Sequence, residues 1–120
     1  NLAELQDRAF RFLDALVWGA DGRTYAALEQ LASDRQAVFD VLKHAEAWLR
    51  DALLLQADKQ TSVVHAERME DVQRLADAFD VGRLCDTVSQ LESLREMNAR
   101  NVNLQLGLLS FWRSVRGYAA

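Results

Sequence analysis

The chain has 120 residues and half of them are apolar, which is enough for one domain with a single buried core. It contains 18 acidic and 14 basic residues, and the resulting net charge of −4 disfavours a protein that grips phosphate backbones. Proline is absent, and the 5 glycines and 1 cysteine exclude a collagen-like chain, a turn-rich all-β fold, an internal disulfide and a cysteine-based zinc site. We therefore expect one domain over residues 1–120.

The ends and the apolar runs of the sequence carry no targeting signal. The first residue is Asn1 rather than methionine, which indicates a piece of a longer protein. Charged residues near the start exclude the apolar segment of a signal peptide. The longest apolar run, Ala52 to Leu55, is far shorter than the ~20 residues of a membrane span. A single cysteine also suits a reducing compartment, so we expect a cytoplasmic protein.

The first half of the chain predicts three helices, because apolar residues recur at steps of three and four. The first helix runs from Leu2 to Leu16, and a break at residues 19–22, which contains two glycines, separates it from a short second helix at about 24–32. Ser33 and Gln36 have the spacing of a capping box, so the third and longest helix is expected to begin at Ser33 and to end near Gln56.

The second half predicts three more helices after a polar loop at residues 58–62. Val63 and Val64 are interpreted as the apolar start of a fourth helix that extends to about residue 79, and Asp80 is expected to cap the fifth. The break at Asn101-Val102-Asn103 precedes a last helix, which extends to about residue 115 with Asn103 as its cap. The predicted fold is a compact all-α bundle of about six antiparallel helices.

A search for catalytic residues gives little. Cys85 and Val81 are both expected on the buried face of the fifth helix, where a cysteine acts as a small hydrophobic residue. His44 and His65 are expected at boundary or surface positions, and neither has a histidine or cysteine four residues on. The carboxylates are expected on solvent-facing sides of the helices. We therefore predict no enzyme activity, no cofactor and no metal for this chain.

Three charged residues stand out on the predicted helix faces. Glu46 and Arg50 have the spacing of an ion pair on a helix surface. Arg95 is the one charged residue that interrupts an apolar stripe, and we interpret it as a side chain that reaches outward near the end of its helix.

The last helix carries more apolar surface than one buried face requires. Its main stripe comprises Leu104, Leu108, Phe111, Trp112 and Val115. Leu106 and Leu109 lie outside that stripe, beside arginines, so the helix is either central in the core or covered by a partner. Tryptophan, leucine and arginine also suit an interface core. The candidate partner-binding residues are Leu106, Leu109, Trp112, Arg113 and Arg116.

An alternative hypothesis is a helical ligand-binding module of a transcription regulator. It requires a pocket between helices with polar groups turned inward, and His44, Arg95 and Tyr25 are the candidates. A small helical enzyme and direct binding to DNA are less well supported.

Three segments together resemble a known family. They are 12–16 (FLDAL), 48–56 (WLRDALLLQ) and 101–106 (NVNLQL), and the similarity extends over about residues 12–115. The chain resembles the carboxy-terminal helical domain of bacterial DNA polymerase III clamp-loader subunits, and it is closer to delta-prime than to gamma/tau. Leu104 stands where many relatives have a proline, which weakens the choice between these subunits but leaves the capping role of Asn103 intact.

The resemblance implies a scaffold function. In that family the carboxy-terminal domains of five subunits form a closed collar, which holds ATPase modules in a ring that loads the sliding clamp onto primed DNA. The implied partners are the collar domains of other clamp-loader subunits, without membrane or direct nucleic-acid contact. The full-length subunits belong to the DNA polymerase III holoenzyme, a DNA-directed DNA polymerase, but their nucleotide-binding and arginine-finger residues are missing from this chain.

Overall fold

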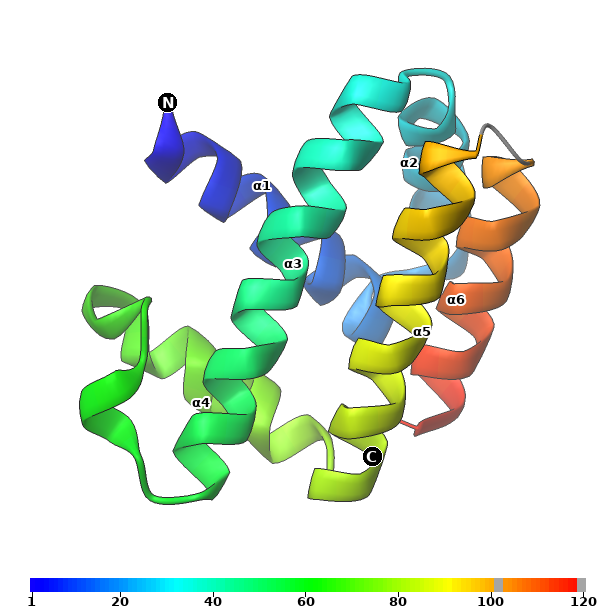
Figure 1. Ribbon diagram of the computed structural model, residues 1–120. Helices are drawn as coiled ribbons and strands as arrows, with labels where there is room; N and C mark the ends of the chain where they lie inside the picture. The colour runs from blue at the N-terminus through cyan, green and yellow to red at the C-terminus, as the bar shows by residue number, and fades with distance from the viewer. Residues whose placement is uncertain (101–102, 119–120) are drawn as a thin grey trace.

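The computed structural model describes residues 1–100 and 103–118, and within these ranges all regular secondary structure is helical (Figure 1). The elements in chain order are α1 (Leu2–Trp18), α2 (Asp21–Ala32), α3 (Arg35–Gln56), the 3-10 turns η1 (Gln60–Ser62) and η2 (Ala66–Arg68), α4 (Met69–Ala78), α5 (Val81–Ala99) and α6 (Leu104–Tyr118). Asn101 and Val102, part of the predicted break before the last helix, lie outside the described residues. The all-α prediction is confirmed.

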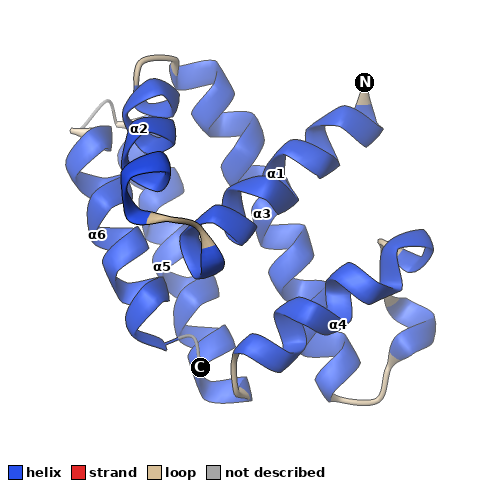
Figure 2. Ribbon diagram, turned by 180° about the vertical axis from the view of Figure 1, so that it is seen from behind, coloured by secondary structure: helices blue, strands red, loops and turns tan. Residues whose placement is uncertain are grey.

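Helix α3 lies at the centre of the molecule and packs against α1, α4 and α5. Helix α6 packs against α5 on one side and against α1 and α2 on the other. Figure 1 shows α3, α5 and α6 side by side with alternating direction, as expected for antiparallel neighbours. The two views together show that α1 and α4 instead cross α3 at an angle (Figures 1 and 2).

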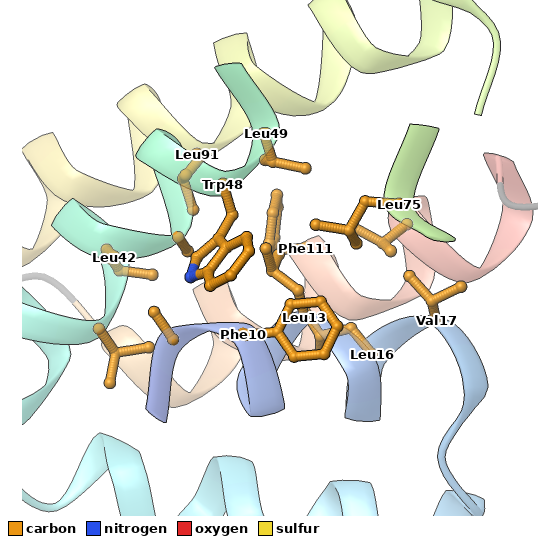
Figure 3. Packing of buried hydrophobic residues seen from close by; sticks show 14 of the residues in the cluster. Phe10, Leu13, Leu16, Val17, Leu42, Trp48, Leu49, Leu75, Leu91 and Phe111 are labelled. Atoms are coloured by element: carbon orange, nitrogen blue, oxygen red, sulfur yellow. The ribbon is translucent and has the colours of Figure 1, made fainter. Parts of the chain in front are cut away.

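The core lies where α1, α3, α5 and α6 meet (Figure 3). Trp48 is at its centre: its ring packs against Phe10 with the centroids 4.9 Å apart, and its Nε1 donates a hydrogen bond to the carbonyl oxygen of Gln6 at 2.8 Å. Burial of a leucine-sized side chain contributes about 1.5–3 kcal/mol. The largest fully buried side chains are Trp48, Leu13, Leu16, Leu42, Leu49, Leu75, Leu84, Leu91, Leu108, Val38, Val72 and Val115.

The helix caps confirm two predictions and correct a third. Asp80 accepts a hydrogen bond from the backbone N–H of Arg83, and Asn103 accepts one from the backbone N–H of Leu106. The predicted start of the third helix at Ser33 is wrong, because Asp34 caps α3 by accepting from the N–H groups of residues 36 and 37. Ser33 instead donates to the carbonyl oxygen of Gln30 and belongs to the end of α2.

Other helix boundaries and faces also differ from expectation. The predicted break at residues 19–22 is shorter, because α2 already begins at Asp21. The fourth helix begins at Met69, since two 3-10 turns precede it. Cys85 and Val81 are exposed, not buried. Cys85 lies about 100° around the helix from the buried Leu84, which places it just outside the stripe that α5 buries against α3.

Candidate subunit interface

The structure divides the predicted partner-binding residues of α6 between different environments. Leu106 is 62% exposed, and Arg113 is also exposed. Leu109 and Trp112 are half-buried and pack against the core. Arg116 is half-buried as well and is engaged by other parts of the chain. These five side chains therefore do not form one continuous open surface.

Arg116 holds the carboxyl end of α1. Its guanidinium donates hydrogen bonds to the carbonyl oxygens of Leu16 at 2.8 Å, Gly19 at 2.9 Å and Ala15 at 3.3 Å, and it pairs with Asp21 at 3.1 Å. The last carbonyl groups of a helix have no partner within the helix and carry partial negative charge. The last turn of α1 contains no basic residue of its own, so α6 supplies the cation.

The opposite side of α6 borders an open groove of about 390 Å³ against α5. Apolar side chains and small polar ones line it together, and none is charged, although 27% of the chain is charged. The lining residues are Gln90, Ser93, Leu94, Met97, Leu106, Gly107, Ser110, Phe111 and Ser114. We call this the α5–α6 groove. Interface cores are characteristically depleted in charged residues, and the groove shares this feature, although its serines are of a type that interfaces contain less often.

Gly107 sets the distance between the two helices at this groove. A Cβ atom at this position would lie 2.9 Å from Cδ1 of Leu94 and 3.0 Å from Cε of Met97, which is closer than ordinary van der Waals contact. Glycine therefore lets α6 lie directly on the side chains of α5. Leu106, one residue earlier, projects at the rim of the same groove.

A buried aspartate–histidine pair lies at the other end of the core. Asp51 is 1% exposed, so the expectation that the carboxylates face solvent is wrong for this residue. His65 is also buried, not at the surface, and its ring stacks on Trp48 with the centroids 3.6 Å apart. Oδ2 of Asp51 lies 2.5 Å from Nδ1 of His65, and the carboxylate also accepts from the backbone N–H groups of Val64 and His65.

This pair fastens a loop rather than performing chemistry. It joins the segment between α3 and α4 to the carboxy-terminal part of α3, and both side chains are buried away from any substrate. Arg68 covers the assembly from outside, with its guanidinium 4.9 Å from the Trp48 ring centroid and paired to Asp7 and Asp71. The buried carboxylate of Asp51 needs its bonds to His65 and to the two backbone N–H groups, because burying an unpaired carboxylate costs much free energy. The sequence signal was present, since Asp51 follows Trp48 by three residues on one helix face.

The residues of the ligand-binding alternative are not assembled into one site. Arg95 borders an open groove of about 700 Å³ between α3 and α5, but neither His44 nor Tyr25 lines it. Arg95 pairs with Glu46 at 3.3 Å, and Glu46 also forms the predicted ion pair with Arg50 at 3.1 Å. Burial lowers the pKa of His44 below its usual value, and nearby Lys43 adds to this effect. The structure therefore does not support the ligand-binding alternative.

No group of three or more histidine, cysteine, aspartate or glutamate side chains in residues 1–100 and 103–118 is placed to hold a metal ion. In the same ranges, no helix combines the length and the hydrophobicity that crossing a membrane requires.

Comparison with known proteins identifies the family. A sequence model described as "DNA polymerase III, delta subunit, C terminal" matches residues 4–113, which is nearly the whole chain. The chain belongs to this family. It is accordingly a carboxy-terminal domain of a DNA polymerase III clamp-loader subunit, as the resemblance implied. No curated protein and no solved structure is significantly similar to it.

The family match covers both the core and the α5–α6 groove, but it ends before all of the groove residues are reached. Ser114 lies beyond residue 113, and so does Arg116, which holds α1. The segment at 48–56 that carried the resemblance contributes Trp48 and Asp51, which are buried. That segment therefore reflects the core of this clamp-loader domain and not its candidate contact surface. The sequence prediction did not include the α5 residues of the groove, which lie between Gln90 and Met97. The only signal in the sequence is that the lining positions there hold polar and apolar residues without a charge among them.

Proposed function

We propose that this domain is an oligomerisation element that holds clamp-loader subunits together in a ring, and that the α5–α6 groove is a contact surface for a neighbouring subunit. One observation carries the proposal: an open, largely apolar groove free of charged residues lies between two helices of a chain in which 27% of the residues are charged. Leu106 is a large apolar side chain left exposed at its rim. Leu106 and its groove neighbours replace the full set of five α6 residues as the proposed contact.

The proposal is tested by the substitution Leu106→Glu, assayed by analytical ultracentrifugation with the other clamp-loader subunits. A carboxylate at the rim of an apolar groove would lose its water on association and would face apolar surface of the neighbouring subunit, so we expect the assembled fraction to fall sharply. The matched control is Leu2→Glu, because Leu2 is 60% exposed and lies at the opposite end of the molecule in α1. Equal association of both variants would contradict the proposal.

We further propose that the parent subunit is delta-prime rather than gamma/tau, following the resemblance of residues 12–115. The test is complementation: the domain replaces the corresponding domain of either subunit in a reconstituted clamp loader. Restoration of assembly in the delta-prime position alone would support the proposal, and restoration in the gamma/tau position alone would contradict it.

We also propose that this domain makes no direct contact with DNA in the loader, in keeping with its net charge of −4. A gel-shift titration with primed DNA tests this directly. Tight binding by the 120-residue chain at physiological salt would contradict it.

A further inference from the structure

A second open groove, of about 370 Å³, lies between α1 and α2. Figure 2 faces this side of the molecule, where α2 and α1 lie nearer to the viewer than α3. The floor of the groove is apolar and comes from three helices: Leu16, Leu28, Leu31 and Val41 close it and are at most 8% exposed, whereas Phe12 is half-buried. We call it the α1–α2 groove. It shares no lining residue with the α5–α6 groove, so nothing said of it depends on the function proposed above.

Contacts between α1 and α2 fix the two sides of the groove relative to each other. Thr24 in α2 donates a hydrogen bond from its hydroxyl to the carbonyl oxygen of Ala15 in α1 at 3.0 Å. Gly19 permits this close turn, since a Cβ there would lie 2.6 Å from the same carbonyl oxygen. The Phe12 ring, which lines the groove, is supported from behind by the Phe111 ring, 6.4 Å away and nearly parallel. The groove is therefore preformed, which lowers the entropy cost of binding.

The rim of the α1–α2 groove is basic in a chain whose net charge is −4. Arg8 and Arg11 stand on α1 above the apolar floor. Arg11 pairs with Asp7 at 2.9 Å, whereas Arg8 forms no ion pair with any of the residues that the structure describes. On the α2 side the wall consists of the small Ala27 and the neutral Gln30. An apolar floor with a cationic rim is complementary to a partner that is apolar on one face and acidic beside it.

We propose that the α1–α2 groove binds an amphipathic acidic helix of a partner protein. The apolar face of that helix lies on the floor beside Phe12, and its carboxylates face Arg8 and Arg11. The wall residues of α1 follow the spacing 8, 11, 12 and 15, which extends over about 10 Å and matches two turns of a docked helix. Nucleic acid fits less well, because phosphates would engage the arginines but leave the half-buried Phe12 ring uncovered.

The experiment measures fluorescence anisotropy of labelled 14-residue peptides titrated with the 120-residue chain. One peptide carries leucine at helical spacing on one face and glutamate on both flanks; a second has phenylalanine in place of leucine. A third has lysine in place of glutamate, and a fourth is a scrambled version of the first. We expect saturable binding of at least one acidic amphipathic peptide, and roughly tenfold weaker binding of the lysine and scrambled peptides.

Two matched pairs of variants locate the binding. Ala27→Glu puts a carboxylate into the groove from an exposed position and should weaken binding about tenfold, whereas Ala26→Glu, on the adjacent exposed position outside the groove, should not change it. Arg8→Glu should weaken binding roughly fivefold, whereas Arg100→Glu, with the same change in net charge, should not. Circular dichroism confirms that each variant is folded.

Several results would overturn the proposal. These are the absence of saturable binding by both acidic peptides, equal binding of the lysine peptide, or equal weakening by Ala26→Glu and Ala27→Glu. Self-association of the chain that Ala27→Glu abolishes would assign the groove to a second copy of this chain instead. Leu106→Glu should leave peptide binding unchanged, so failure here and failure of the proposed subunit contact are distinguishable.

Discussion

Helix α6 has two sides with opposite properties. On the side toward α1 and α2 it contributes Arg116, whose guanidinium is hydrogen-bonded to three carbonyl oxygens at the end of α1 and paired with Asp21. On the side toward α5 it contributes Leu106, Ser110 and Ser114 to a groove that contains no charged residue and stays open. On the first side, the guanidinium of Arg116 is already bound within the domain. The second is the surface that we propose as the contact with a neighbouring subunit.

The difference shows that residue type alone does not identify a contact surface. Arginine and tryptophan are typical of interface centres, yet Arg116 and Trp112 contact each other and the rest of the domain. The guanidinium carbon of Arg116 lies 5.6 Å from the centroid of the Trp112 ring. Serine is depleted at interfaces, yet Ser110 and Ser114 line the open groove. What separates Arg116 from the groove residues is that its guanidinium already has hydrogen-bond partners within the domain, at the end of α1 and at Asp21.

Arg116→Ala should produce the largest change in stability. It removes hydrogen bonds to three carbonyl oxygens, and it leaves the end of α1 without a cation. Because the side chain is half-buried, water can replace part of these bonds, and we expect a loss of about 3 kcal/mol in the free energy of unfolding. Urea denaturation followed by circular dichroism measures it.

The matched control is Arg113→Ala, which removes an exposed arginine from the same helix. It should change the free energy of unfolding by less than about 0.5 kcal/mol. If the two variants are equally stable, Arg116 does not hold α1 in solution, and the contrast between the two sides of α6 is lost.

Leu109→Glu should have a smaller effect, a loss of about 1.5 kcal/mol in the free energy of unfolding. Leu109 is half-buried against the core, so a carboxylate there is partly desolvated. Arg113 lies four residues on and can pair with the new carboxylate, which offsets part of the cost. Thermal unfolding provides the measurement. A variant as stable as the wild type would show that Leu109 belongs to the open surface.

The helices of this domain could be predicted from the sequence because apolar residues recur at helical spacing in all of them, although this period is strongest in α1 and α4 and weakest in α5. Their exact ends could not, since Ser33 and Asp34 both suit an N-cap, and only the bonds of Asp34 to residues 36 and 37 decide between them. The buried state of His65 depends on Asp51, which is fourteen residues away in the sequence. A polar residue on an apolar helix face, such as Asp51 beside Trp48, is the signal that a distant partner exists.

The candidate interface could be predicted only in part. Leu106 could be recognised because it lies off the main stripe of its helix. The α5 wall of the groove could not, because the neighbour of each face of α6 depends on how the helices pack and not on the period within one helix. For the same reason Arg116 had the composition of a contact residue, but its three carbonyl partners lie about a hundred residues earlier in the chain.

Leu106→Glu should leave the stability of the isolated domain within about 0.5 kcal/mol of the wild type. Leu106 is the third residue of α6 after the cap Asn103, and its backbone N–H already donates to the Asn103 side chain. A glutamate at this position completes a capping box and also faces the positive end of the helix. Thermal unfolding of the free domain measures this. A loss of more than 2 kcal/mol would make Leu106 a core residue, and reduced association would then report unfolding.

The smallest effect is expected from salt on subunit association through the α5–α6 groove. None of the residues that line the groove is charged, so raising NaCl from about 0.05 to 0.5 M should change the dissociation constant by less than about twofold, even though salt at this level screens exposed ion pairs strongly. Ultracentrifugation at several salt concentrations provides the values. A dissociation constant that rises tenfold or more would place the contact on a charged surface, such as the side of α6 that carries Arg113, because only charged groups give an association such a dependence on ionic strength.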